Sequence, residues 1–435
     1  ANSIKLVDFK LFSPKTVFLL SNKPSKIIMF RFTAILSICI LSLFSCSEST
    51  EIKSGSWRAE VSTIAGALPF NLDIQQKGDG YEVHAINGEE RLLMDKAYLD
   101  EEDSLHIPME IFDAEIIAKA SGDKLNGVFK KKMGDLTVRE SNFTATFGEN
   151  HRFVEKSEKT TFDVSGKYDV EFRYDNESYP AVGVFEQTGN EVTGTFLTTT
   201  GDYRYLQGNV VDDSLKLSCF DGTHVFLFKA KIEEDKLVGG VFCASLTYTE
   251  EWSAVKNENA VLPEANSLTH LKEGYDSIKF SFKNEKGETV SLTDERYQNK
   301  VVAVQILGSW CPNCMDETKF LVPFYEKNKG KGFEVIGLAF EKKTDPDFAY
   351  PKIERMKERF NVPYEVLIAG INDKTEAAKS LPMLDHILSF PTLITIDKKG
   401  KVREIHTGFS GPGTGAYYDK FVTDYNRLIE KLLNE

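Results

Sequence analysis

The feature that most constrains the fold is a Cys-x-x-Cys motif that closely follows an apolar run. Val301–Leu307 is apolar except at Gln305, and such a run is typical of a strand buried on both faces of an α/β sheet. Cys311 and Cys314 come next, and a helical pattern covers Met315–Lys329. The motif is therefore predicted to lie at a strand-to-helix junction.

A Cys-x-x-Cys pair at such a junction has a specific chemistry. The first cysteine lies at the helix N-terminus, where unpaired N–H groups and the helix dipole stabilise a thiolate. The second lies one turn later, close enough to attack a mixed disulfide and release the substrate. The pair therefore indicates a redox-active disulfide, and we expect no further cofactor.

Other uses of the two cysteines have weaker support. Zinc needs a second pair of ligands, but the chain has no other Cys-x-x-Cys, and His386 and His406 are far apart in sequence. Gly308 stands three residues before the first cysteine, where a peroxidase would have Thr or Ser. A copper site would need an added histidine, and none is obvious. We therefore expect no bound metal.

Three further features accompany the motif. Glu317 lies three residues past the second cysteine, Gly332–Glu341 has the pattern of the following strand, and Phe390–Gly400 places a proline before a strand and hairpin. With Trp310–Cys314, these features resemble the thioredoxin superfamily, most closely the TlpA/ResA-like thiol-disulfide oxidoreductases tethered to bacterial membranes. The resemblance covers residues 275–435 and implies an α/β thioredoxin fold there.

The resemblance also implies roles for single residues. Cys311 would be the attacking thiolate and Cys314 the buried resolving thiol. Pro391 would be cis, keep its loop against the pair and leave the Phe390 backbone free to pair with a substrate strand. A proline at the start of a strand is the alternative for Pro391. Trp310 would cover the disulfide, although a packing role is equally compatible with the sequence.

Two departures from the family bear on proton transfer and helix shape. Thioredoxin keeps a buried Asp beneath the cysteines, where this chain has Gln305, which cannot titrate. ResA-like proteins place a Glu after the next strand, so we expect Glu341 to transfer the proton; a solvated strand-end glutamate is the alternative. Lys319 stands where the family often has Pro, and Pro323 is expected to kink the helix instead.

The remainder of this domain follows the same pattern. Residues 346–360 are predicted to be helical, 363–368 to form an added strand and 417–433 to form the last helix. In relatives, the loop after the last strand flanks the substrate groove, so the glycine-rich segment Thr407–Gly415 is expected to shape specificity. Phosphate binding there has little support, because no lysine follows the last glycine as in a P-loop.

The middle of the chain, residues 57–256, is predicted to be antiparallel β structure. Short alternating runs are punctuated by Gly, Asn and Asp every 8–12 residues, as in a barrel or sandwich. Asp103–Ile107 is echoed by Asp213–Leu217, and Asp123–Phe129 by Asp235–Phe242. These echoes indicate a duplicated unit, whose two copies either close into one barrel or stand side by side.

The two proposed repeats cover about 57–150 and 165–256. The second holds Cys219 on an expected strand 214–220 and Cys243 on strand 236–244, with another strand between them. Next-but-one strands are about 9–10 Å apart, too far for a disulfide, so we expect two buried free thiols. A spacer or docking module is the simplest role for the β region, and a ligand-binding barrel is the alternative.

Charge argues against nucleic-acid binding. The chain carries −13 overall, and acidic residues outnumber basic ones by 17 within 46–261, whereas 262–435 is near neutral at −1. Phosphate backbones demand clustered Lys and Arg. The chain also has a single, short apolar stretch, which excludes transporters and channels.

That apolar stretch, Phe30–Phe44, has the character of a secretory signal with a basic start and a small residue before its break. Leu43–Cys46 looks like a bacterial lipobox, in which Cys46 would be diacylated and become the mature N-terminus. An ordinary cleaved signal with an incidental cysteine is the alternative. We expect Met29 to be the start, with residues 1–28 upstream of it. Residues 47–56 suit a flexible tether.

Together these features predict a lipid-anchored protein of the cell envelope, facing the periplasm or the cell exterior. Its domains would be 1–46 as extension and signal, the tether, the β region, a linker at 257–274 and the thioredoxin-like domain. It would exchange disulfides with partner proteins and draw electrons from a membrane thiol donor.

We expect reduction rather than oxidation. The dipeptide Pro312-Asn313, which would line the substrate groove with Trp310 and Phe390, lacks a histidine that would make the pair strongly oxidising. A disulfide oxidase or isomerase is the alternative. The alternative of another class is a binding lipoprotein that works through its β region.

Overall fold

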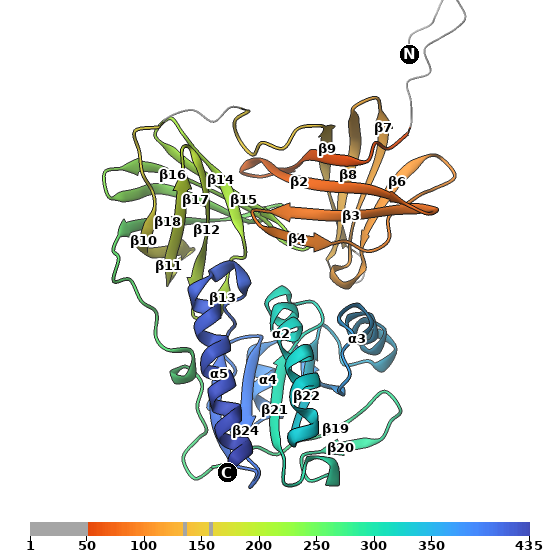
Figure 1. Cartoon of the computed structure of the whole chain (residues 1–435), viewed down its shortest axis with the longest axis vertical. Coiled ribbons are helices and arrows are strands. Elements are labelled where there is room, and N and C mark those ends of the chain that lie inside the picture. The colour runs from red at the N-terminus through yellow and green to blue at the C-terminus, as the bar shows by residue number, and fades with distance from the viewer. Residues whose placement is uncertain (1–50, 134–136, 156–159) are drawn as a thin grey trace, which may run out of the picture. The chain divides into compact units, whose positions relative to one another are not determined.

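The computed structural model describes residues 51–133, 137–155 and 160–435 (Figure 1). These residues belong to one compact unit. The apolar stretch, the lipobox with Cys46, the Met29 start and residues 1–28 lie outside the described residues, so the expectations about them stay predictions. In the part of the chain that the structure describes, no helix is long and apolar enough to cross a membrane.

The first half of the β region is one nine-stranded antiparallel sheet in the order β4-β3-β2-β1-β9-β8-β7-β6-β5. Alternate residues of β1 are buried, among them Trp57, Ala59 and Val61, as the period of two requires. A bridge from Tyr81 to Ala97 bends the two ends of the sheet toward one another. The strands are β1 (Gly55–Thr63), β2 (Gly66–Lys77), β3 (Gly80–Asn87), β4 (Glu90–Leu93), β5 (Tyr98–Leu99), β6 (Ser104–Met109), β7 (Ala114–Ser121), β8 (Lys124–Met133) and β9 (Thr137–Phe147).

The second half is a separate nine-stranded antiparallel sheet in the order β11-β10-β18-β17-β16-β15-β14-β12-β13. β11 also pairs with β12, which closes eight of these strands into a barrel. Aromatic rings fill its interior, including Phe172, Phe196, Phe228 and Trp252. The strands are β10 (Gly166–Tyr174), β11 (Glu177–Thr188), β12 (Glu191–Thr198), β13 (Gly201–Asp202), β14 (Leu206–Val211), β15 (Ser214–Phe220), β16 (Val225–Glu233), β17 (Lys236–Ser245) and β18 (Tyr248–Lys256).

The barrel also packs its outer face against the first sheet. Leu227 and Cys243 belong to the apolar core of the first sheet, and the ring of Phe220 stacks on Phe70 at 4.2 Å between centroids. Cys219, by contrast, lies in the core of the barrel. β16 separates the strands of the two cysteines, and both are buried and free, so the prediction of two unpaired thiols is confirmed.

The C-terminal part is a five-stranded mixed sheet with the order β23-β22-β21-β24-β25, the thioredoxin-like arrangement that the sequence predicts. β21, β22, β23 and β25 run in the same direction, and β24 runs antiparallel to them. All seven residues of β21 are buried. The elements are β21 (Val301–Leu307), α2 (Pro312–Asn328), β22 (Phe333–Glu341), α3 (Pro346–Phe360), β23 (Val366–Ile371), α4 (Lys374–Ser380), β24 (Thr392–Ile396), β25 (Val402–Thr407) and α5 (Ala416–Asn434).

Some boundaries differ from the prediction. α2 begins three residues earlier than expected, because Pro312 fits the first helical turn; it continues past Pro323 to Asn328. The strand expected at 363–368 runs three residues later. A hairpin of β19 (Ser281–Lys283) and β20 (Thr289–Ser291), and the seven-residue α4, were not anticipated because elements this short leave little periodicity.

Candidate active site

The two cysteines of the motif form a disulfide at the start of α2, with their Cα atoms 5.2 Å apart. Cys311 is the N-cap residue, and its Sγ accepts a hydrogen bond from the Cys314 N–H at 3.2 Å. An N–H aimed at this sulfur stabilises negative charge on it, as a thiolate nucleophile requires. Cys311 is 5% exposed and Cys314 is fully buried, which makes the first the more accessible of the pair.

The predicted cis proline lies against this disulfide. The Phe390–Pro391 peptide bond is cis, and Cys311 Sγ is 3.4 Å from the carbonyl oxygen of Phe390. The Trp310 indole contacts the Phe390 ring edge-on at 5.7 Å and donates a hydrogen bond to the carbonyl of Phe340. The structure thus brings together four residues that the sequence singled out: Trp310, Cys311, Phe390 and Pro391.

Glu341 lies beneath the loop that carries the first cysteine. It is 1% exposed, so the alternative of a solvated glutamate is wrong. Its two carboxylate oxygens accept hydrogen bonds from the N–H and the hydroxyl of Ser309, both at 2.8 Å. Burial raises the pKa of this carboxyl. The contacts show a carboxyl that holds the active-site loop; its expected proton transfer stays a prediction.

A second buried carboxyl, Glu317, lies on α2, three residues after Cys314. Gln305 Nε2 donates a hydrogen bond to one Glu317 oxygen at 2.9 Å, and lies 3.4 Å from the carbonyl of Cys314. The other Glu317 oxygen is buried without a hydrogen-bond partner, and burial raises the pKa of this group to about 8. Gln305, which cannot titrate, thus holds Glu317, which can.

Sequence reasoning used Glu317 only as a family marker and assigned it no role. A usable signal was present, because residues three apart on a helix share a face, and Glu317 is three residues past Cys314. Thr318, four residues past Cys314, lies on the same face, and its hydroxyl donates a hydrogen bond to the Cys314 carbonyl at 2.8 Å.

Comparison with known proteins agrees with this geometry. Residues 270–420 match the Redoxin family. The thioredoxin-like protein YneN of Bacillus subtilis is 25% identical over 32% of this chain and 73% of its own length. The thiol-disulfide oxidoreductase ResA of Geobacillus kaustophilus is 28% identical over 28% of this chain and 62% of its own.

The C-terminal part of this chain is a TlpA/ResA-like domain of the thioredoxin superfamily. Such domains perform thiol-disulfide chemistry with their own cysteines. Among solved structures, a thiol-disulfide oxidoreductase from Bacteroides fragilis is 26% identical over 34% of this chain and 99% of its own, with a TM-score of 0.25. In the described ranges, no group of three or more His, Cys, Asp or Glu is placed to hold a metal ion.

The β region reaches the active site of the ResA-like domain, which the sequence did not predict. Residues 199–204 join β12 to β14 and include the two-residue strand β13. This segment, called the turn 199–204 below, contacts the active site at several points. Asn313, inside the cysteine motif, donates a side-chain hydrogen bond to the Asp202 carbonyl at 3.3 Å. Ser389, two residues before the cis proline, donates its hydroxyl to the Thr200 carbonyl at 2.8 Å.

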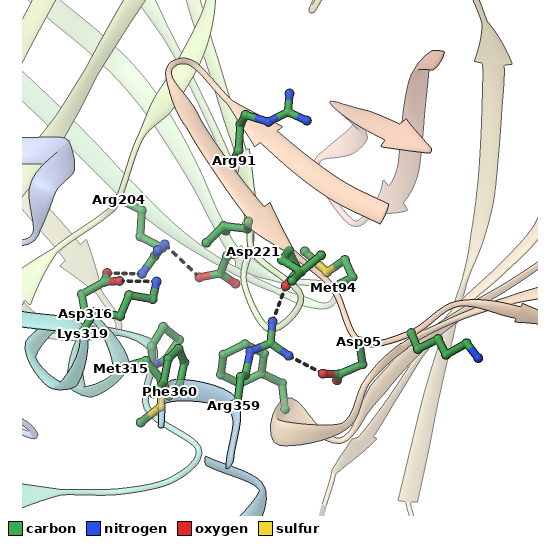
Figure 2. Close-up of a pocket in the computed structure, with 15 residues that line it drawn as sticks. Arg91, Met94, Asp95, Arg204, Asp221, Met315, Asp316, Lys319, Arg359 and Phe360 are labelled. Atoms are coloured by element: carbon green, nitrogen blue, oxygen red, sulfur yellow. Dashed lines mark hydrogen bonds and ion pairs between the residues drawn. The ribbon is translucent and has the colours of Figure 1, made fainter. Parts of the chain in front are cut away.

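Arg204 anchors this turn to the ResA-like domain (Figure 2). The side chain is 4% exposed and lies among three carboxylates. Its guanidinium contacts Asp316 of α2 at 2.5 Å, Glu90 of β4 at 2.6 Å and Asp221 at 3.3 Å. Lys319 pairs with the other oxygen of Asp316 at 3.0 Å. The cluster joins all three parts of the described chain.

An open cleft of about 500 Å³ lies beside Pro312 (Figure 2). Met315 of α2 and Phe360 of α3 form apolar parts of its wall. Arg359 crosses the cleft to bond Asp95 and the Leu93 carbonyl of the first sheet. The cleft therefore offers space for a substrate chain next to the motif.

Proposed function

We propose that this protein is a thiol-disulfide oxidoreductase that reduces disulfides of extracytoplasmic proteins through Cys311 and Cys314. The observation that carries the proposal is the Cys311 sulfur, the more exposed of the pair, which accepts a helix N–H and lies against the cis-proline loop. If the protein worked only through its β region, the thioredoxin-like domain would not need this arrangement.

In the proposed reaction, the Cys311 thiolate attacks a substrate disulfide and forms a mixed disulfide, and one substrate thiolate leaves. Cys314, as a thiolate, then attacks the Cys311 sulfur and releases the second substrate thiolate. The substrate gains two electrons and the pair becomes the disulfide seen here. A membrane thiol donor restores the dithiol.

Glu317 is the better placed of the two carboxyls to take the proton of Cys314. One of its oxygens is unpartnered, and Gln305 links it to the backbone of Cys314. Both oxygens of Glu341 are engaged by Ser309, so Glu341 is the alternative. The two are separated by the pH dependence of exchange in Glu317→Gln and Glu341→Gln: the proton-transfer group is the one whose loss removes an ionisation from the profile.

Trapping tests the proposed reaction directly. In Cys314→Ser the resolving step is lost, so the reduced variant should accumulate a mixed disulfide with a peptide disulfide, seen by mass spectrometry. Cys311→Ser should form none. Equal adducts from both variants, or none from Cys314→Ser, would contradict the proposed roles.

The direction and the location are further parts of the proposal. Pro312-Asn313 favours reduction, and an oxidase or isomerase is the alternative. We propose that Cys46 is lipidated and anchors the chain in the cell envelope, on the strength of the lipobox-like residues before it. Cys46→Ala should move the protein from the membrane fraction to the soluble fraction of lysed cells; unchanged fractionation would contradict the anchor.

We also propose that the two β sheets derive from one duplicated unit. In support, β1 begins at Gly55 and β10 at Gly166, while β2 begins at Gly66 and β11 at Glu177, so each pair is 111 residues apart. A binding lipoprotein acting through these sheets is the alternative of another class. It is favoured if Cys311→Ser leaves the cellular phenotype of the wild type intact.

A further inference from the structure

We propose that the turn 199–204 is a specificity-determining part of the active site: it covers the substrate groove, so that small or extended disulfides reach Cys311 more easily than disulfides in folded proteins. The inference rests on the proposed thiol-disulfide exchange. It assigns a role in that reaction to the β region.

The turn contacts the two segments on either side of Cys311 in space, the start of α2 and the cis-proline loop, between which we place the substrate groove. On the α2 side, the amide of Asn313 bonds the carbonyl of Asp202. On the cis-proline side, the hydroxyl of Ser389 bonds the carbonyl of Thr200. The loop after β25 also contacts the turn, because the Gly411 N–H donates a hydrogen bond to the Asp202 carboxylate at 2.6 Å. The turn therefore lies across the groove rather than beside it.

Two glycines allow this close approach. Gly408 has a φ of +76°, and a Cβ atom built there would lie 2.9 Å from the backbone carbon of Thr200. Gly201 faces Asn313 in the same way, with its Cβ position 2.0 Å from the Asn313 amide nitrogen. A side chain on Gly408 would push the turn away, because the atoms it meets are backbone. The close approach at Gly408 thus depends on the missing side chain, whereas at Gly201 the Asn313 side chain could move.

The anchor next to the turn keeps it in place. Arg204 ends the turn, and its guanidinium is buried between Asp316 on the ResA-like domain and Glu90 on the first sheet. Pulling the turn away would separate these buried charges, which is unfavourable unless water replaces each partner. The turn is therefore held over the groove, and a substrate must fit under or around it.

Little of the reactive sulfur's residue is exposed. Cys311 is 5% exposed, and an open cleft lies beside its neighbour Pro312, bounded by α2, α3 and the segment after β4 (Figure 2). A small disulfide or an extended chain fits such a space, whereas a folded protein presents a convex surface that the turn blocks.

The test compares three substrates of the full-length reduced protein: 5,5′-dithiobis(2-nitrobenzoate), an unstructured twelve-residue peptide with one disulfide, and native insulin. We expect the peptide to be reduced at least tenfold faster than insulin. Gly408→Ala should raise the insulin rate at least threefold and leave the rate with the nitrobenzoate within twofold.

Gly400→Ala is the matched control. Gly400 also has a positive φ, +80°, and lies next to the other end of β25, but nothing lies within 4 Å of its Cβ position. It should keep the wild-type ratio of peptide to insulin rates. Ser389→Ala, which removes one contact without adding bulk, should change the ratio in the same direction as Gly408→Ala. Hydrogen exchange of residues 199–204 reports whether the turn is released.

Equal wild-type rates with peptide and insulin would overturn the inference alone. So would an unchanged ratio in Gly408→Ala when hydrogen exchange shows that the turn has been released. A turn that stays in place in Gly408→Ala would overturn the argument that its close approach requires a glycine at 408. If the wild-type protein reduces none of the three substrates, the proposed function is wrong and the inference falls with it.

Discussion

At the scale of single residues, two buried carboxyls flank the cysteine pair and differ in what holds them. Ser309 engages both oxygens of Glu341, whereas Gln305 engages one oxygen of Glu317 and leaves the other unpartnered. Such a buried, incompletely solvated carboxyl favours its neutral form. Of the two carboxyls, Glu317 is therefore the one whose ionisation we expect to be more strongly coupled to folding.

Glu317→Gln should therefore flatten the pH dependence of stability. Burial raises the pKa of Glu317 from 4.5 to about 8 in the folded protein, so its stabilising contribution is complete below pH 4.5 and is lost as the pH rises through 8. Relative to the variant, the oxidised wild type should lose free energy of unfolding on the order of a few kcal/mol across this window. Urea titrations at several pH values measure it, and parallel curves for the two proteins would contradict the assignment.

At the scale of elements, the sequence predicted well where one environment covers a whole strand or helix. β21 is buried on both faces and appears as an apolar run. The helix after it was also predicted, although α2 begins at Pro312 rather than Met315. β16 is also buried along most of its length, but for a different reason. One face of β16 fills the barrel, and the other packs against the first sheet. The sequence pattern does not distinguish such a strand from one buried inside an α/β sheet.

Leu227→Ala on β16 tests this second packing surface. Leu227 is fully buried and packs in the core of the first sheet, so the truncation should cost about 2–5 kcal/mol of unfolding free energy. Val241→Ala on the neighbouring strand, where the side chain is 38% exposed, should cost well under half as much. Chemical denaturation compares them; similar losses would mean that the outer face of the barrel is not packed.

At the scale of the whole described chain, the contacts between the β region and the ResA-like domain could not be predicted from the sequence. Arg204 and Asp316 are 112 residues apart and belong to different parts. Each looks like an ordinary surface charge in its own segment, and nothing in the local pattern indicates that they meet. Motifs therefore predicted the cysteine pair and its loop, but not the turn that lies over them.

Arg204→Met tests how strongly this cluster joins the parts. Removing Arg204 takes the guanidinium away from buried Glu90 and leaves Asp316 with Lys319 and Asp221 with His224, so unfolding free energy should fall by about 3–5 kcal/mol. Arg91→Met is the control, since Arg91 pairs with Asp73 at the surface with its side chain 54% exposed, and such pairs contribute about 0–1 kcal/mol. Equal effects in thermal or urea unfolding would contradict a buried anchor at Arg204.

The measurement that tests the central claim most directly is the reduction potential of Cys311 and Cys314 in the full-length protein, equilibrated with glutathione. We predict a reversible two-electron titration with a potential near or below about −230 mV, on the thioredoxin side of the scale. A value near about −120 mV, like that of a strong oxidant, would contradict the reductase direction. No reversible titration of the pair at all would contradict thiol-disulfide exchange itself.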